Sequence, residues 1–302
     1  MAQDWLYFLL YVGEQERTDL CLAEVVTPLV RSALATPGID RWFFLRYLDD
    51  AGPHLRLRFA GDVDAINDLF LRAGPALAHR LQTLPELEVE PATPLVGSAH
   101  APRRQGAVAS RPPTLELGVY EPEYAKYGGP AGVALAERVF QASSQIALDN
   151  LQHLGDRTTR ALWAMAMMQT VLEACLAHQD GPTFWEQYAW HWSGAARPGA
   201  GPLREHLTKQ AAPRAEAVRQ RIDRLLREPT TRRLLVGHAE VIRTALDEAE
   251  QLNLPPARDD LVFHQIHLMN NRIDLGPTDE AYLATLLRAT SASEESSWPV
   301  SI

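Results

Sequence analysis

Residues 41–60 read RWFFLRYLDDAGPHLRLRFA, which is the pattern of a β-hairpin. Residues 41–48 are dominated by aromatic and aliphatic side chains, as buried strands are. The following DDAGP has turn chemistry, because Asp, Gly and Pro favour the backbone angles of turns. From 54 to 60 apolar and other residues alternate strictly, which is typical of a strand with two different faces. The first part of the chain is therefore predicted to be built on a sheet.

Further elements flank this hairpin in the order of a ferredoxin-like fold. A strand, a helix, a second helix and a strand are predicted at residues 5–12, 16–35, 62–84 and 86–90. The resulting order β-α-β-β-α-β is that of the ferredoxin-like split unit. Residues 91–113 are rich in Pro, Ala, Arg and Ser and are predicted to be an exposed loop, and residues 114–120 to be one more strand.

From about residue 130 the apolar residues follow a helical period. Helices are predicted at 131–153, 157–178, 181–191, 202–227, 231–252, 259–271 and 278–291. The expected fold class is α+β, a small N-terminal antiparallel (ferredoxin-like) sheet followed by a mostly helical half. We expect residues 1–120 to form the sheet region and residues 121–302 the helical region, together one compact domain.

Charge and composition exclude several classes of protein. The net charge of -9 argues against direct nucleic-acid binding, because phosphates are neutralised by basic surfaces. No segment approaches the length of an apolar membrane span, so no membrane association is expected. Cys21 and Cys175 lack CxxC or metal-type spacing and are interpreted as free buried thiols. Free thiols fit a reducing compartment, and we expect a cytoplasmic protein.

The last strand of the hairpin carries three cationic side chains on one face. His54, Arg56 and Arg58 alternate with apolar residues, so they share the face opposite to the core. Arg46 on the paired strand is expected to join them across the hairpin. One interpretation is a solvated face with salt bridges to a helix. The other is an anion site, because arginine matches carboxylates and three neighbouring cations repel each other unless an anion lies between them.

A second candidate site lies near the C-terminus, where residues 263–272 read FHQIHLMNNR. On a helix, His267 and Asn271 lie on one face. His264 and His267 have the spacing of a metal-chelating pair, but no third ligand with supporting spacing is present and HExxH is absent. We therefore predict no metal. A histidine beside apolar residues is either a packed core residue or a proton-transfer group.

Four motifs together resemble one family, in the same order and at similar distances. They are DWLYFLLY at 4–11, RWFFLRYLDDAGPHLRLRF at 41–59, VYEPEYAKYGG at 119–129 and IHLMNNR at 266–272. The family is the lantibiotic dehydratase C-terminal domain, also called the thiopeptide-type bacteriocin biosynthesis domain. The resemblance extends from about Asp4 to Thr290, nearly the whole chain.

The resemblance implies a function in antibiotic biosynthesis. In lantibiotic dehydratases, an N-terminal part transfers glutamate from charged tRNA to Ser or Thr of a ribosomally made precursor peptide. The C-terminal domain then eliminates glutamate and leaves dehydroalanine or dehydrobutyrine. The chain resembles only the second part, which implies a stand-alone elimination subunit, a lyase, in a split dehydratase. The implied partners are the precursor peptide, with its leader and core, and a separate glutamylating subunit. The resemblance implies no cofactor, and a homo-oligomer is left open.

The resemblance also implies a set of site residues. Arg56 and Arg58 match the HLRLR strand of the family, and His267 matches the histidine of its HMxxNR motif, with Leu268 in place of Met. These three are the expected catalytic residues. The arginine of the family's YxRE segment has no counterpart in YEPE at 120–123, where the nearest cation is a lysine. The expected substrate-binding residues are Arg46, His54, Tyr120, Lys126, Tyr127, Asn271 and Arg272.

Each expected catalytic residue has a role in β-elimination. The reaction needs a base at the substrate Cα and a cation at the departing carboxylate, together with stabilisation of the enolate. We expect Arg56 and Arg58 to hold the glutamyl adduct and its departing carboxylate, and His267 to exchange the proton. Tyr120 or Tyr127 is a candidate for the oxyanion.

Two other functions stay open at this point. Thiopeptide pyridine synthases belong to the same family and join two dehydroalanines in a formal [4+2] cycloaddition that expels the leader peptide. The chain keeps the HLRLR strand and the histidine of the His267 motif, which favours elimination. The non-enzymatic alternative is a scaffold that binds the leader peptide or the glutamylating partner.

Overall fold

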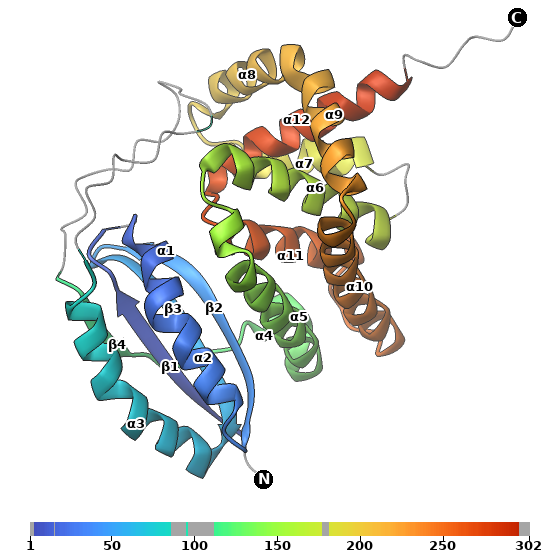
Figure 1. Cartoon of the computed structure of the whole chain (residues 1–302). Helices are drawn as coiled ribbons and strands as arrows, with labels where there is room; N and C mark the ends of the chain where they lie inside the picture. Colours follow the sequence, from blue (N-terminus) through green and yellow to red (C-terminus); the bar gives the residue numbers. More distant parts are fainter. Residues whose placement is uncertain (1–2, 15, 86–94, 96–111, 177–180, 296–302) are drawn as a thin grey trace, which may run out of the picture. The chain divides into compact units, whose positions relative to one another are not determined.

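The computed structural model describes residues 3–14, 16–85, 95, 112–176 and 181–295. Contacts divide the chain into two units. The sheet unit comprises Met1–Ala92 and Arg104–Gln152, and the helical unit comprises Thr93–Arg103 and His153–Ile302. A four-stranded antiparallel sheet followed by helices confirms the predicted α+β class (Figure 1).

The sheet has the strand order of a ferredoxin-like unit. It consists of β1 (Gln3–Tyr11), β2 (Ile39–Asp49), β3 (Gly52–Asp62) and β4 (Thr114–Leu117), in the order β2-β3-β1-β4. All neighbouring strands are antiparallel, so each helical connection passes over one strand. The strand predicted at 86–90 lies outside the described residues, and β4 occupies the position beside β1. β4 is shorter than the predicted 114–120, because the chain leaves the sheet after Gly118, whose N–H still donates to the carbonyl of Tyr7.

The predicted helices of the sheet unit are present. The first consists of α1 (Arg17–Cys21), the π-helical turn η1 (Leu22–Val26) and α2 (Thr27–Leu34), and the second is α3 (Val63–Gln82). The π turn precedes Pro28, which has no N–H to donate to the carbonyl of Glu24. Arg80 Nη1 donates to that carbonyl instead, at 3.2 Å. These helices contact the sheet (Figure 1), whose residues Leu55, Leu57 and Phe59 are fully buried.

Helix α5 (Gly129–Asp149) belongs to the sheet unit, and it follows the short α4 (Tyr124–Tyr127). The backbone N–H of Trp42 donates to Gln141 Oε1 at 3.3 Å, and that of Phe44 donates to Ser144 Oγ at 3.1 Å. Side chains of α5 therefore satisfy the edge of β2. This pairing explains why the sheet unit continues to Gln152, beyond the boundary at residue 120 that the sequence suggested.

The helical unit follows the predicted pattern of elements. After the 3-10 turn η2 (Leu151–His153), its elements are α6 (Arg157–Cys175), α7 (Gly181–Trp192), α8 (Ala200–Ala211), η4 (Ala212–Arg214), α9 (Ala215–Arg227), α10 (Pro229–Gln251), α11 (Arg258–Arg272) and α12 (Pro277–Glu295). The single helix predicted at 202–227 is divided because Pro213 interrupts its hydrogen bonds. Among the described residues, no helix is long and apolar enough to cross a membrane.

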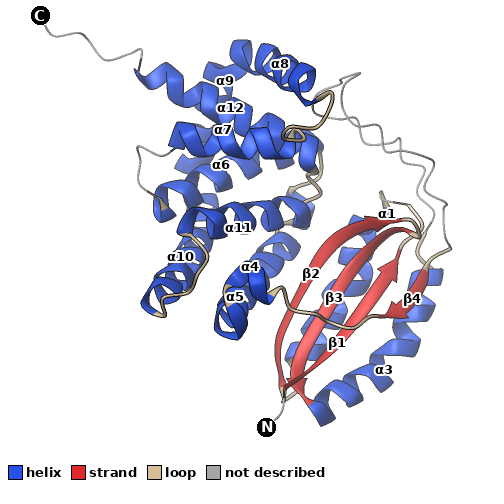
Figure 2. Ribbon diagram, turned by 180° about the vertical axis from the view of Figure 1, so that it is seen from behind, coloured by secondary structure: helices blue, strands red, loops and turns tan. Residues whose placement is uncertain are grey.

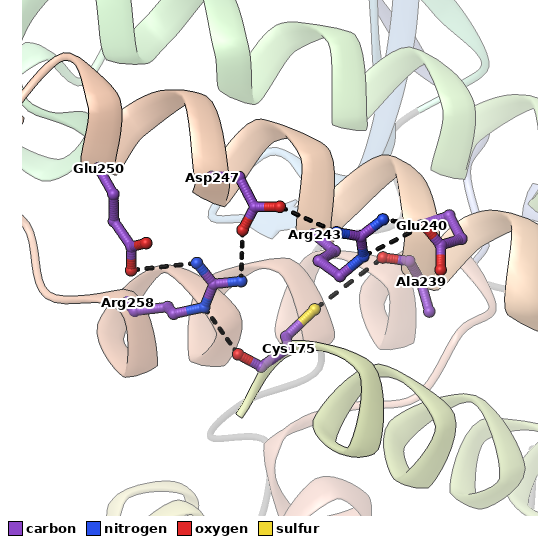
Figure 3. Close-up of polar contacts among 7 residues, drawn as sticks. All are labelled: Cys175, Ala239, Glu240, Arg243, Asp247, Glu250 and Arg258. Atoms are coloured by element: carbon purple, nitrogen blue, oxygen red, sulfur yellow. Dashed lines mark hydrogen bonds and ion pairs between the residues drawn. The ribbon is translucent and has the colours of Figure 1, made fainter. Parts of the chain in front are cut away.

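An ion-pair network fixes the start of α11 (Figure 3). Arg258 Nε donates to the carbonyl oxygen of Cys175 at 2.7 Å, at the end of α6. Its terminal nitrogens lie 2.8 Å from Asp247 and 3.0 Å from Glu250 on α10. Asp247 also pairs with Arg243 at 3.0 Å. Three helices are thereby joined at the end of α11 that precedes the predicted catalytic histidine by about two turns.

Candidate functional site

The cationic residues of β3 lie on the sheet face opposite to α1 and α3. Their strand neighbours on that face are Tyr7, Leu9 and Tyr11 on β1 and Phe43, Leu45 and Tyr47 on β2. The segment that joins β4 to α4 crosses this face, as Figure 2 shows. The predicted alternation of β3 is confirmed, and the cationic face is lined by aromatic rings.

Arg58 is the most enclosed cation of this face. Only 7% of its surface is exposed, and its guanidinium carbon lies 4.2 Å from the ring centre of Tyr7 and 5.0 Å from that of Tyr120. Its Nε has no hydrogen-bond partner within the described part of the chain. Burial lowers the pKa of the Arg58 guanidinium, because desolvation disfavours a charge. The rings of Tyr7, Phe43 and Tyr120 are therefore the neighbours of this charge within the described residues.

Arg56 lies beside Arg58 on the same face and is partly exposed. Its guanidinium carbon stacks on the Tyr47 ring at 3.2 Å from the ring centre, and its Nε donates toward His54 Nε2 at 3.5 Å. His54 is buried between Tyr11 and Tyr47, and its Nδ1 lies 3.1 Å from the carbonyl oxygen of Gly52. Burial lowers the pKa of His54, so this imidazole is neutral near pH 7 and supports Arg56. The expectation of three cations is corrected to two.

Arg46 does not lie with these residues, contrary to the sequence prediction. The register of the hairpin places it across from Leu55, so its side chain is on the face that the helices cover. There its Nη2 forms an ion pair of 2.5 Å with Asp19 on α1. A one-residue difference in register exchanges the two faces of a strand, and the turn sets that register.

The crossing segment positions Tyr120 over the cationic face. The N–H of Gly118 donates to the carbonyl of Tyr7 at 2.9 Å, and a side chain at residue 118 would meet the Tyr7 ring at 2.8 Å. Tyr120 then packs on Trp5 at 4.5 Å between ring centres, and its hydroxyl donates to Glu137 Oε1 at 2.9 Å. Burial raises the pKa of Tyr120, so its hydroxyl stays protonated.

The other two candidates from this segment have different surroundings. Lys126 Nζ lies 3.4 Å from Glu123 Oε2 and 5.5 Å from the ring centre of Tyr127. Tyr127 is buried and packs edge-on against Phe140 at 5.6 Å. Phe140 in turn contacts Phe43 on β2. Tyr127 is therefore linked to the cationic face through this row of aromatic rings.

Some arginines of the hairpin have a carboxylate partner among the described residues and others do not. Arg41 has Glu137 at 2.5 Å, and Arg46 has Asp19. Arg56 and Arg58 form no ion pair with any carboxylate of the described residues, and both lie on the same face. The two arginines of the β3 face therefore differ from Arg41 and Arg46 in having no carboxylate partner within the described residues.

The helical unit contains the second candidate site, centred on His267 of α11. Its Nδ1 lies 2.9 Å from Glu280 Oε1 in the first turn of α12. Glu280 is fully buried, and its Oε2 accepts hydrogen bonds from the Tyr188 hydroxyl and from Asn270 Nδ2, the latter at 3.2 Å. The side chain of His267 is 24% exposed, so the ring joins a buried carboxylate to an accessible surface.

Aromatic rings hold the imidazole in this position. Trp192 stacks on His267 with 4.2 Å between ring centres and an angle of 21°. His191 precedes Trp192 at the end of α7, and burial, together with the neighbouring His267, lowers the pKa of His191. The sequence patterns do not identify Trp192, Glu280 or Tyr188 as neighbours of His267. No sequence spacing connects these residues, because they come from α7, α11 and α12.

Two further candidates flank His267 along α11. Asn271 is one turn beyond it and partly exposed, as predicted for the same face. Arg272 is 1% exposed, and its Nη1 donates to the carbonyl of Leu268 at 2.9 Å. Its charge acts on the buried His238 of α10, so Arg272 is an interior residue and not part of the accessible face. Within the described ranges, no group of His, Cys, Asp and Glu has the arrangement of a metal site.

The family model and two of the most similar curated proteins point to the same family. Residues 5–291 match the family described as lantibiotic biosynthesis dehydratase C-term. Nisin biosynthesis protein NisB of Lactococcus lactis subsp. lactis is 28% identical over 143 residues, which are 47% of this chain and 11% of that protein. Subtilin biosynthesis protein SpaB of Bacillus subtilis is 28% identical over 144 residues, 48% of this chain and 11% of that protein. The matched part is thus about a tenth of each relative.

Solved structures share the fold. The tRNA dependent lantibiotic dehydratase MibB from Microbispora sp. 107891 has a TM-score of 0.62 at 23% identity, over 97% of this chain and 28% of that chain. TsrL has a TM-score of 0.63 at 17% identity, over 98% of this chain and 95% of that chain. TbtD, a pyridine synthase from thiomuracin biosynthesis, has a TM-score of 0.68 at 17% identity, over 96% of this chain and 98% of that chain.

Proposed function

Because the chain belongs to the lantibiotic biosynthesis dehydratase C-terminal family, we propose that it eliminates glutamate from glutamylated Ser or Thr of a ribosomally made precursor peptide. The products are dehydroalanine from Ser and dehydrobutyrine from Thr. The proposed partners are the precursor peptide and a separate subunit that glutamylates it with charged tRNA. The proposed site of action is the cytoplasm.

The observation that carries this proposal is the pair of arginines without protein carboxylates. A glutamyl ester retains one free carboxylate, and elimination releases a second one from the ester. Arg56 and Arg58 have no carboxylate partner among the described residues, although Arg41 on the neighbouring strand has one. Guanidinium groups bind carboxylates through paired hydrogen bonds. Two guanidiniums therefore match the two carboxylates of departing glutamate.

The reaction divides between the arginines and the imidazole. His267 removes the proton from the substrate Cα, and the electron pair of that C–H bond forms the Cα–Cβ double bond. The Cβ–O bond breaks, and its electrons leave with the glutamate carboxylate. Arg56 and Arg58 neutralise the charge that develops there, which is where fixed cations lower the barrier most. Transfer of the Cα proton by a neutral imidazole is general base catalysis.

An assay with the purified protein and one defined peptide tests the proposal. The chain is incubated with a precursor peptide that carries one glutamyl-Thr ester, and the peptide mass is followed. We expect loss of glutamate and appearance of dehydrobutyrine. The His267→Ala variant should leave the ester intact while its circular dichroism matches that of the parent chain. Its melting temperature should be lower, because the buried Glu280 loses its ion-pair partner. Unchanged elimination by this variant would remove His267 from the mechanism.

Pyridine synthesis is the second candidate, and TbtD supports it because that enzyme shares the fold over almost its whole length. A peptide that already contains two dehydroalanines distinguishes the two reactions. Formation of a macrocycle with release of the leader, together with an untouched glutamyl ester, would replace elimination by cycloaddition. Tight binding of the precursor without conversion of either peptide would instead indicate a scaffold.

A further inference from the structure

Glu280 makes the helical unit unusual because its carboxylate is entirely enclosed. Its exposed fraction is 0%, and its two oxygens accept hydrogen bonds from groups on two other helices. Oε1 faces His267 Nδ1 at 2.9 Å, and Oε2 faces the Tyr188 hydroxyl and Asn270 Nδ2. Burial raises the pKa of Tyr188 well above its usual value, so that hydroxyl remains a donor.

A packing role alone does not explain this choice of residue. Removing a carboxylate from water costs free energy, and apolar residues of similar volume join helices at least as well. No arginine or lysine of the described residues forms an ion pair with Glu280. Its ion-pair partner is the imidazole of His267, and its charge also acts on His191. Buried carboxylates directed at an accessible imidazole are typical of sites that move protons.

The hydrogen bond to Glu280 determines which nitrogen of His267 carries the proton in the neutral ring. A carboxylate only accepts, so Nδ1 must donate when it faces Glu280 Oε1. In the neutral ring the lone pair is then on Nε2. The Trp192 stack fixes the plane of the ring. Asp279, next to Glu280, forms an ion pair with Arg157 and accepts the N–H of Gly276, which fixes the first turn of α12.

We propose that Glu280 is a positioning residue, which holds the proton of His267 on Nδ1 so that Nε2 is the atom that takes the substrate proton. This inference rests on the proposed elimination. The carboxylate also stabilises the imidazolium that forms after the proton transfer. In many active sites a catalytic base is oriented by a third group, and here Glu280 would orient His267 in this way.

Nitrogen-15 NMR of the full chain with labelled histidine tests the assignment without any substrate. The chain has ten histidines, and the His267→Asn variant identifies the signal that belongs to residue 267. In the neutral ring we expect a protonated Nδ1 and an unprotonated Nε2. A ring protonated on Nε2 in the parent chain would overturn the proposal, whether or not any variant folds.

The Glu280→Gln variant tests the consequence for catalysis. A glutamine can present its NH2 group to Nδ1, which moves the ring proton to Nε2. We expect a mixture of ring tautomers and a kcat for elimination lower by about 100-fold, with KM changed much less. A parent-like tautomer together with a parent-like kcat would contradict the proposal.

Asp279→Asn is the matched control, because it loosens the same turn of α12 without touching the imidazole. We expect it to lower the melting temperature, to leave the tautomer of His267 unchanged and to keep kcat within about threefold. If it lowers kcat as much as Glu280→Gln does, the role of Glu280 is structural. If the parent chain eliminates no glutamate but shows the tautomer and its change in Glu280→Gln, the proposed function fails and the tautomer assignment stands.

Discussion

The sheet face of the first unit and the α11 face of the second unit treat charge in opposite ways. On β3, Arg56 and Arg58 have no protein carboxylate among the described residues. On α11, His267 has Glu280, which is fully buried. In the proposed function, the first arrangement binds the anionic adduct, whereas the second sets the tautomer of the base before the substrate arrives.

The largest expected effect comes from Arg58→Met, which removes the buried charge and retains much of the volume. We expect kcat/KM for elimination to fall by about 10²–10³-fold, as when one stabilising donor is lost. Stability should be unchanged or higher, because a buried charge without a carboxylate partner costs free energy. Urea unfolding and the peptide mass assay measure the two quantities.

Arg41→Met is the matched control on the same hairpin. It leaves the carboxylate of Glu137 buried without its cation. We expect a loss of about 2 kcal/mol in the free energy of unfolding, less than the ~3–5 for a fully buried pair, because the Arg41 side chain is 22% exposed. If Arg58→Met destabilises the protein as much as Arg41→Met does, Arg58 is a structural residue.

The next effect concerns acid stability and depends on one imidazole of the helical unit, that of His238. His238 is buried with no hydrogen-bond partner in the described structure, and burial lowers its pKa from 6.5 to about 4, with a smaller contribution from Arg272. The unfolded chain therefore takes up a proton at a higher pH than the folded chain does. The contribution of neutral His238 to the free energy of unfolding is fully present above pH 6.5. It is lost as the pH falls toward 4, by up to about 1.4 kcal/mol per pH unit.

Replacement of His238 by Leu checks this pH dependence. The difference in unfolding free energy between the variant and the parent should become more favourable to the variant as the pH falls from 6.5 to about 4. Urea unfolding at several pH values measures it. A constant difference over that window would show that His238 keeps an ordinary pKa in the folded state.

The smallest expected effect is that of Arg46→Met on catalysis. Because Arg46 pairs with Asp19 on the helix-covered face, we expect kcat/KM within about threefold of the parent chain. The melting temperature should fall slightly, since the partner Asp19 is 32% exposed and exposed pairs contribute little. A loss of activity as large as that of Arg58→Met would place Arg46 with the anion site after all.

The sequence predicted the strands of the hairpin but not their register. The alternation of β3 shows which of its residues share a face, since successive side chains point to opposite sides. The face of Arg46 depends on which residue lies across from it, and this is set by the pairing of Asp49 with Gly52 at the turn. Two of the three expected cations are present as such, whereas His54 became neutral through burial that its own strand does not determine.

The helical site was less predictable than the sheet site. The face of α11 that carries His267 and Asn271 follows from helical spacing. Its carboxylate comes from the next helix, after a turn whose geometry a sequence pattern does not specify. Glu280 and Tyr188 are also far apart along the chain and meet only through packing of α7 against α12. Helix periods therefore identify the imidazole and leave its partner unidentified.

The hydrogen bonds from β2 to α5 have a consequence for any attempt to dissect the protein. Strand edges with free N–H groups recruit other chains, and here Gln141 and Ser144 occupy two such groups. A fragment that stops after Tyr127 would expose these amides beside Trp42 and Phe44, so self-association into extended aggregates is the outcome to expect. A fragment intended to carry the arginines alone should therefore continue through Asp149.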